Sequence, residues 1–233
     1  METLGAVVVA AGRGSRMGAA ISKQYLPLDG VPVLARSLLA LDAVSAISDI
    51  ALVCGADDVE LCRGLADRYR ISKLRAIVPG GSERQQSVYA GLGQLGNEWV
   101  IVHDGVRPFI VEDDVVRCWQ AAVEHGAAVL AVPVKETVKV ADPEQFVLHT
   151  PDRSSLWAIQ TPQAFRREQL LQAHREAERA GFAGTDDAML IERLGLPVKL
   201  VQGSYANIKI TTPDDLLWAE QHIRATRKGA GNE

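Results

Sequence analysis

Apolar residues along this chain form short runs that alternate with amphipathic stretches of about ten residues or more. A continuous apolar run suits a strand covered on both faces of a parallel sheet, whereas apolar residues three and four positions apart suit a helix. On these criteria we predict strands at 6–11, 50–54, 76–78, 99–103, 127–134 and 198–201, and a further apolar stretch at 208–210. The predicted helices cover 32–41, 57–69, 83–92, 112–125, 166–179, 185–194 and a last segment from 213, with Asp57 as N-cap of the second.

The alternation of strand and helix predicts an α/β fold with a Rossmann-like, mostly parallel central sheet, helices on both faces and right-handed crossovers. The pattern changes between Pro133 and Gln160, where 137–140 and 146–149 resemble the two strands of a hairpin. Such a hairpin has too small a core to be stable alone and must pack on something. We therefore expect a single domain over residues 1–233, with 133–160 as an inserted, protruding β-hairpin arm. Residues 224–233 lack apolar periodicity and are expected to fray.

A glycine-rich loop with cations follows the first predicted strand. Gly12, Gly14 and Gly18 lack the side chains that keep backbone N–H groups away from an anion, and Arg16 and Lys23 add positive charge. The spacing excludes the dinucleotide fingerprint, because a methionine stands where the third glycine is required, and no P-loop Gly-Lys-[Ser/Thr] follows. The loop therefore suits a polyphosphate; a flexible turn that happens to carry two cations is the simpler alternative.

Composition and charge narrow the classes of function. The chain has 233 residues, of which 47% are hydrophobic and 23% charged, as in an ordinary globular protein. A net charge of −4 argues against a sequence-independent nucleic-acid binder. No apolar stretch is long enough for a membrane span and the N-terminus lacks a signal-peptide pattern, so we expect a cytoplasmic protein. Cys54, Cys62 and Cys118 match no metal or redox spacing and are expected to be reduced and partly buried.

A candidate metal ligand ends the predicted strand 99–103. Asp104 follows directly, and Gly105, Arg107 and Pro108 come next. Ligands of open α/β sheets collect at the carboxyl ends of the strands, and Mg²⁺ prefers one or two carboxylates together with phosphate oxygens. The sequence thus makes Asp104 a candidate for Mg²⁺, against the alternative of an aspartate that caps the loop. For His103 the simplest interpretation is a local hydrogen bond.

The chain shows no recognisable Ser, Cys or His nucleophile motif. An attacking phosphate monoester, with a second pKa of about 6, is largely dianionic near neutral pH and needs no general base. An enzyme acting on it would use its residues for positioning and charge neutralisation. The loop cations and Asp104 fit that description.

Seven sequence blocks carry a resemblance to a known family. They read AAGRGSRM from Ala10, KQYL from Lys23, GGSERQQSV from Gly80, VHDGVRPF from Val102, RSSLWAIQTPQAF from Arg153, GTDDA from Gly184 and YANIKITTPDDL from Tyr205. Together and in this order they resemble the 2-C-methyl-D-erythritol 4-phosphate cytidylyltransferases of the sugar-phosphate nucleotidyltransferase superfamily. The resemblance implies transfer of a cytidylyl group from CTP to 2-C-methyl-D-erythritol 4-phosphate with Mg²⁺, giving the CDP-alcohol and pyrophosphate, in the non-mevalonate route to isoprenoids.

The same resemblance implies a role for individual residues. Arg16 and Lys23 match the cations that stabilise the transition state at the α-phosphorus, and Arg153 and Lys209 match those that orient the attacking phosphate. The remaining matches are Ala10, Ala11, Gly12 and Gly14 around the triphosphate, Gly80, Gly81, Ser82 and Ser87 around the cytosine and ribose, and Arg107, Thr137 and Thr185 near the methylerythritol. Relatives are dimers in which each arm lies on its partner, so we expect a homodimer with shared active sites.

The sequence departs from the family pattern at two places, and two rival functions remain. Asp104-Gly-Val-Arg replaces Asp-Ala-Ala-Arg, and Ala206 stands where some members carry an acid. A ribitol-5-phosphate cytidylyltransferase is the nearest rival, but the block from Arg153 favours the methylerythritol substrate. A non-catalytic nucleotide-sensing domain is a second rival, and retention of both Arg16 and Lys23 argues against it. A dehydrogenase is excluded by the glycine spacing.

Overall fold

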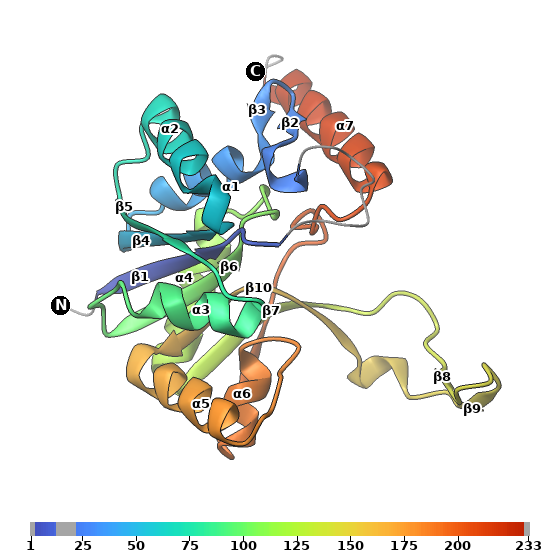
Figure 1. The fold of residues 1–233 in the computed structure, drawn as a ribbon. Coiled ribbons are helices and arrows are strands. Elements are labelled where there is room, and N and C mark those ends of the chain that lie inside the picture. Colours follow the sequence, from blue (N-terminus) through green and yellow to red (C-terminus); the bar gives the residue numbers. More distant parts are fainter. Residues whose placement is uncertain (1–2, 13–21, 231–233) are drawn as a thin grey trace.

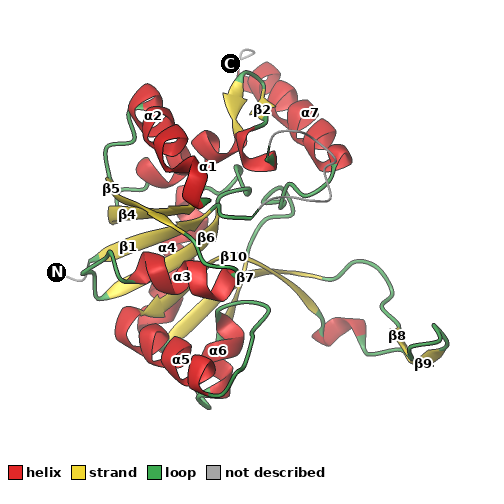
Figure 2. Ribbon diagram, viewed as in Figure 1, coloured by secondary structure: helices red, strands yellow, loops and turns green. Residues whose placement is uncertain are grey.

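The structure is a computed structural model that describes residues 3–12 and 22–230, with side chains up to 227. Within these residues the main sheet contains β1 (Leu4–Val9), β4 (Ile47–Cys54), β5 (Leu74–Pro79), β6 (Trp99–Asp104), β7 (Ala127–Pro133), β10 (Trp157–Arg166) and β11 (Lys199–Gln202). Their order is β11-β7-β10-β6-β1-β4-β5, and every neighbouring pair is parallel except the two that involve β10. The predicted mostly parallel sheet is thus confirmed (Figure 2).

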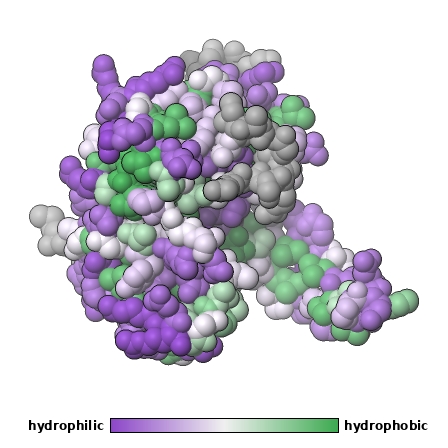
Figure 3. All heavy atoms as spheres, viewed as in Figure 1, coloured by the Kyte–Doolittle hydropathy of each residue, from purple (hydrophilic) through white to green (hydrophobic). Residues whose placement is uncertain are grey.

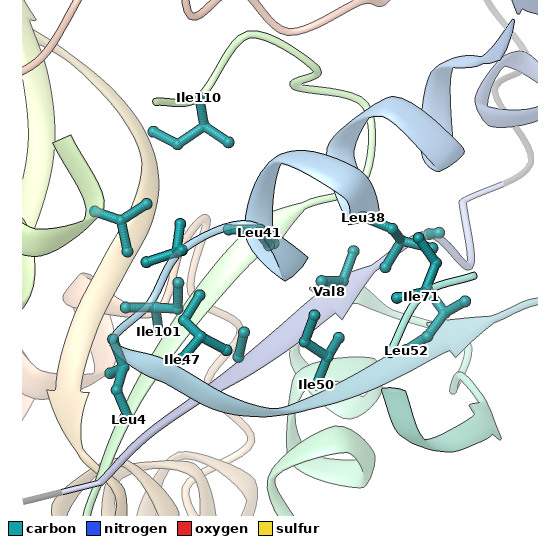
Figure 4. Packing of buried hydrophobic residues seen from close by; sticks show 14 of the residues in the cluster. Leu4, Val8, Leu38, Leu41, Ile47, Ile50, Leu52, Ile71, Ile101 and Ile110 are labelled. Carbon is teal, nitrogen blue, oxygen red and sulfur yellow. The ribbon is translucent and has the colours of Figure 1, made fainter. Parts of the chain in front are cut away.

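Helices cover both faces of this sheet, as predicted. They are α1 (Val33–Asp42), α2 (Val59–Tyr69), α3 (Arg84–Leu92), α4 (Glu112–His125), α5 (Arg167–Arg179), α6 (Ala188–Arg193) and α7 (Pro213–Ala230). Because side chains alternate along a strand, Ala6 and Val8 of β1 pack with α1, α2 and α4, whereas Val7 packs with α3, α5 and α6. In Figure 1, α1 and α2 lie on the opposite side of the sheet from α5 and α6, and Figure 4 shows part of the first cluster around Val8, Leu38 and Ile101.

Strand β10 was not predicted. A polar run, Gln160-Thr161-Pro162-Gln163, interrupts its apolar pattern, and its pairing with β7 shifts register between Ile159 and Gln163. The three polar side chains of this run are nevertheless buried, because each has a hydrogen-bond partner outside the strand: Gln160 bonds to Ser204, Thr161 to Asp104, and Gln163 to the turn before α6. Contacts with distant segments therefore stabilise a strand that the pattern of apolar residues did not predict.

The segment between β7 and β10 protrudes from the body as an arm (Figure 1). Its strands β8 (Val140–Ala141) and β9 (Val147–His149) pair antiparallel, so the predicted hairpin is present with shorter strands. Residues 157–160, which we assigned to the arm, belong to β10 of the main sheet. Phe146 and Leu148 on the arm are 72% and 62% exposed, and Figure 3 shows hydrophobic patches on this projection.

Several predicted boundaries were wrong. Helix α2 begins at Val59 after a 3-10 turn (Ala56–Asp58), so Asp57 is not its N-cap. Helix α6 begins at Ala188, because residues 185–187 form the turn that precedes it. Helix α7 continues through 224 to Ala230, although we expected fraying there; Arg227 forms an ion pair with Asp29 that ties it to the turn after β2 (Pro27–Leu28).

Candidate active site

A cavity opens at the carboxyl ends of β1 and β6, beside the loop that follows β5. The predicted site residues that line it are Ala10, Ala11, Gly12, Lys23, Gly81, Ser82, Ser87, Asp104 and Lys209. Gly14 and Arg16 lie outside the described residues. Residues from distant parts of the chain thus meet where parallel strands end, as this fold type requires.

Two glycines let the walls of this cavity approach each other. A Cβ on Gly80 would come within 2.5 Å of the Ala11 Cβ and 2.6 Å of the Ser87 Oγ. A Cβ on Gly81 would come within 2.4 Å of the Gln86 Cβ. The loop after β5 therefore lies directly against the loop after β1, which leaves a narrow slot between them.

Lys23 begins a 3-10 turn (Lys23–Tyr25) and lines the cavity together with Ala11 and Gly12. The next residue, Gln24, is buried, and its Nε2 donates a hydrogen bond to the Ala10 carbonyl oxygen at 3.0 Å. This bond ties the turn that carries Lys23 to the end of β1. We did not predict a role for Gln24, since a glutamine in the KQYL block has no distinguishing pattern of its own.

Asp104 ends β6 at the base of the cavity, and three cations surround its buried carboxylate. Lys209 Nζ lies 2.8 Å from Oδ2, Arg84 Nε lies 3.4 Å from Oδ1, and Arg107 Nε lies 3.7 Å from Oδ2. Burial alone would raise the pKa of Asp104, but Arg84, Lys209 and Arg107 outweigh it and hold the pKa well below its usual range. Asp104 is therefore ionised at any pH at which the protein would work.

A buried hydrogen-bond chain orients this end of β6. The Asp104 backbone N–H donates to Thr161 Oγ1 at 3.0 Å, so the Thr161 hydroxyl proton is available to His103 Nδ1, 3.1 Å away. His103 Nε2, which then carries the ring proton, donates to the Arg107 carbonyl oxygen at 3.1 Å. Desolvation lowers the pKa of His103 to about 4, so the imidazole is neutral and structural, in line with the local hydrogen bond we expected.

Lys209 and Arg107 are placed by a small hydrophobic cluster under α7. Ile210 packs with Val106 in this cluster, and the Ile210 N–H donates to the Val106 carbonyl oxygen at 3.0 Å. Arg107 donates from Nη1 to the Asn207 carbonyl oxygen at 2.8 Å. Residues 208–210 thus form an extended connection that holds Lys209 at the cavity, although they are not a strand.

A second cavity adjoins the first and shares three of its residues, Arg84, Asp104 and Lys209. Arg107 and Thr185, both expected near the polyol, line it together with Thr161 and Gln163 of β10. Two further site residues, Arg84 and its partner Asp187, were missed. Their signal was the position of Arg84 at the start of a helix, directly after a glycine turn.

Two predicted site residues lie elsewhere. Thr137 and Arg153 are on the arm, both exposed, and neither lines these two cavities. Arg153 Nη1 donates instead to the Lys135 carbonyl oxygen at 2.9 Å, within the arm. The arm extends away from the body that holds the cavities (Figure 1).

The arrangement combines a glycine-lined slot, cations around one ionised carboxylate, and a second cavity that shares three lining residues with the first. Compared with known proteins, residues 4–225 match the model of the family described as IspD, 2-C-methyl-D-erythritol 4-phosphate cytidylyltransferase. The chain belongs to this family. It is a cytidylyltransferase that transfers the cytidylyl group of CTP to 2-C-methyl-D-erythritol 4-phosphate in the non-mevalonate pathway.

Relatives of this cytidylyltransferase match its sequence and its fold over nearly the whole chain. The 2-C-methyl-D-erythritol 4-phosphate cytidylyltransferase from Pelotomaculum thermopropionicum is 51% identical over 97% of this chain and 96% of its own. The one from Geobacillus thermodenitrificans is 50% identical over 92% of this chain and 94% of its own. Among solved structures, 4-diphosphocytidyl-2C-methyl-D-erythritol synthase from Anaerococcus prevotii superposes with a TM-score of 0.86 at 33% identity over 96% of both chains. The Thermus thermophilus cytidylyltransferase gives 0.78 at 32% identity over 96% of this chain and 100% of its own. Within the described residues, no helix of the cytidylyltransferase is both long enough and apolar enough to span a membrane.

Proposed function

We propose that CTP occupies the first cavity, that 2-C-methyl-D-erythritol 4-phosphate occupies the second, and that the two react where the cavities join. The observation that carries this assignment is that the two cavities share the same carboxylate and the same lysine, Asp104 and Lys209. Group transfer requires both substrates in contact, and a junction of two cavities provides that contact.

The chemistry follows from the groups at the junction. An oxygen of the acceptor phosphate attacks the α-phosphorus of CTP, and the bond from that phosphorus to the bridging oxygen of the β-phosphate breaks, which releases pyrophosphate. No base is needed, because the attacking phosphate is already anionic. Lys23, with Arg16 in the glycine loop, neutralises charge that develops on the α-phosphoryl group, and Lys209 orients the attacking phosphate.

Mg²⁺ fits this site as an ion held chiefly by the nucleotide phosphates. The described residues contain no cluster of three or more His, Cys, Asp or Glu side chains that could hold a metal alone. Asp104 is nevertheless ionised and buried at the base of the slot, and one carboxylate plus phosphate oxygens is a usual set for this ion. When bound, Mg²⁺ would supply charge neutralisation of the triphosphate; Asp104 would hold it in exchange for part of its contact with Lys209.

The arm completes the site of a partner copy in this proposal. Thr137 and Arg153 lie outside both cavities of their own chain, and the arm exposes Phe146 and Leu148 to solvent. A symmetric dimer would cover these apolar side chains and bring Arg153 to the partner's acceptor phosphate.

Cys54, Cys62 and Cys118 are all free and buried, which supports a cytoplasmic location.

Turnover with alternative acceptors tests the function. Pyrophosphate release is measured with CTP and either 2-C-methyl-D-erythritol 4-phosphate or ribitol 5-phosphate. We expect the methylerythritol substrate to give the higher kcat/KM by more than tenfold, the equivalent of about 1.4 kcal/mol. A preference for ribitol 5-phosphate would assign the rival cytidylyltransferase activity, and no pyrophosphate with either acceptor would indicate the nucleotide-sensing alternative.

A further inference from the structure

Arg84 occupies the junction of the two cavities. It is the first residue of α3, directly after the glycine turn, and lines both cavities together with Asp104 and Lys209. Asp104 and Lys209 already have roles in the proposed reaction, whereas Arg84 has none. A side chain that borders both substrate cavities lies where the new bond must form.

Two carboxylates hold the guanidinium of Arg84, and its side chain stays partly exposed. Its Nη1 donates to Asp187 Oδ2 at 2.7 Å, and its Nε approaches Asp104 Oδ1 at 3.4 Å. Among the described residues, Nη2 of Arg84 has no hydrogen-bond partner, and the Arg84 side chain is 28% exposed to solvent. Burial disfavours the charged form, but Asp187 and Asp104 outweigh it and raise the pKa of Arg84, so the cation is permanent.

Asp187 is built into the protein interior, so it can hold Arg84 in one orientation. Its side chain is 1% exposed, and the backbone N–H groups of Asp187 and Ala188 both donate to Gln163 Oε1 at 3.2 Å. Behind it, His174 Nε2 lies 3.4 Å from Asp187 Oδ1. A carboxylate packed this closely orients its arginine partner more strongly than an exposed one could.

We infer that Arg84 binds the phosphate of the acceptor at the junction, and that Asp187 is the positioning residue that holds it there. Arg84 lines both cavities, so its planar guanidinium can donate from Nη2 to an acceptor phosphate oxygen while Nη1 stays on Asp187. The cluster of Arg84, Arg107 and Lys209 with Asp104 and Asp187 has three positive and two negative charges, so it favours an anionic ligand. This inference rests on the proposed function, because it uses the placement of the acceptor in the second cavity.

Kinetics of four variants test it: Arg84→Gln, Arg84→Lys, Asp187→Asn and the double variant R84Q/D187N. We expect R84Q to lower kcat by about 100-fold and raise the KM for 2-C-methyl-D-erythritol 4-phosphate by about tenfold, with the Kd for CTP measured without acceptor changed less than threefold. D187N should lower kcat/KM for the acceptor by about tenfold. The double variant should match R84Q alone, since Asp187 acts through Arg84.

The matched control is Arg75→Gln, which breaks an exposed ion pair with Asp49 away from both cavities and should leave turnover unchanged. Wild-type turnover is measured first; its absence would refute the proposed function rather than the role of Arg84. Normal acceptor kinetics in R84Q, a loss confined to CTP binding, or multiplicative losses in the double variant would overturn the inference. If R84Q does not fold, R84K decides: an unchanged acceptor KM in a folded R84K protein would also overturn it.

Discussion

Lys209 Nζ lies 2.8 Å from Asp104 Oδ2, and this pair joins the end of the central strand β6 to the connection that precedes the last helix. Asp104 is buried and Lys209 is partly exposed, so the carboxylate is fixed while the ammonium can respond to a ligand. A fixed anion with a movable cation suits the proposed binding of a phosphate together with a metal ion. The predictions below concern the groups around this pair.

Lys23→Ala and Arg16→Ala should each lower kcat by about 100-fold or more, because each removes a cation from the developing charge at the α-phosphorus. The melting temperature of either variant should stay within a few degrees of wild type. Steady-state kinetics and thermal melting measure both quantities, with the exposed Lys199→Ala as control. Normal turnover in either variant would refute the mechanism.

Asp104→Asn should abolish most activity, since an amide keeps the shape of the side chain but loses the charge that faces the three cations and that would face Mg²⁺ in the proposed complex. EDTA should inhibit the wild type, and added Mg²⁺ should restore it. Kinetics over a range of Mg²⁺ concentrations provide the measurement, and Asp49→Asn, a surface carboxylate paired with Arg75, is the control. If the D104N enzyme has wild-type activity and the same dependence on Mg²⁺ concentration, Asp104 only caps the loop.

His103 should make folding stability depend on pH. Its pKa is about 4 in the folded protein and about 6.5 when unfolded, so between these values the unfolded chain binds a proton that the folded chain does not. Its stabilising contribution is therefore complete above pH 6.5 and decreases as the pH falls towards 4. We expect wild type to lose about 2 kcal/mol more than His103→Gln between pH 7 and pH 5 in denaturant unfolding. Equal losses in the two proteins would show that His103 is not buried as a neutral imidazole.

Gly105→Ala should destabilise the protein by about 1–2 kcal/mol. A Cβ at this position would lie 2.8 Å from Leu34 Cδ1, 3.2 Å from Ala10 Cβ and 3.3 Å from the Val9 carbonyl oxygen. Leu34→Val shortens the crowding side chain, so the double variant should be less destabilised than the sum of the two single variants. If the destabilisation of the double variant equals the sum of those of the two single variants, contact with Leu34 does not explain why this chain has glycine at position 105.

Two inactive variants should restore activity when their chains are mixed, if the active site is shared. Lys23→Ala and Arg153→Ala chains are unfolded together and refolded; random pairing makes roughly half the dimers mixed, each with one intact site. About a quarter of wild-type activity is then expected. Mass spectrometry verifies the mixed dimers, and no recovery in their presence would place Arg153 in the site of its own chain.

Much of the fold was determined by local sequence. Continuous apolar runs specified the strands around Val8 and Ile101, and amphipathic spacing specified the helices that cover them, because burial of apolar surface is a property each segment carries by itself. The glycine loop and the acid at the end of β6 were likewise visible, since their chemistry follows from residue type and position at a strand end.

Tertiary structure alone decided strand β10 and the ion pair at the junction of the cavities. Strand β10 exists because buried polar side chains such as Thr161 and Gln163 find partners on distant segments, and the Arg84–Asp187 pair joins α3 to the turn before α6. Hydrogen bonds and ion pairs between residues far apart in the chain leave no periodic pattern, so only the folded arrangement reveals them.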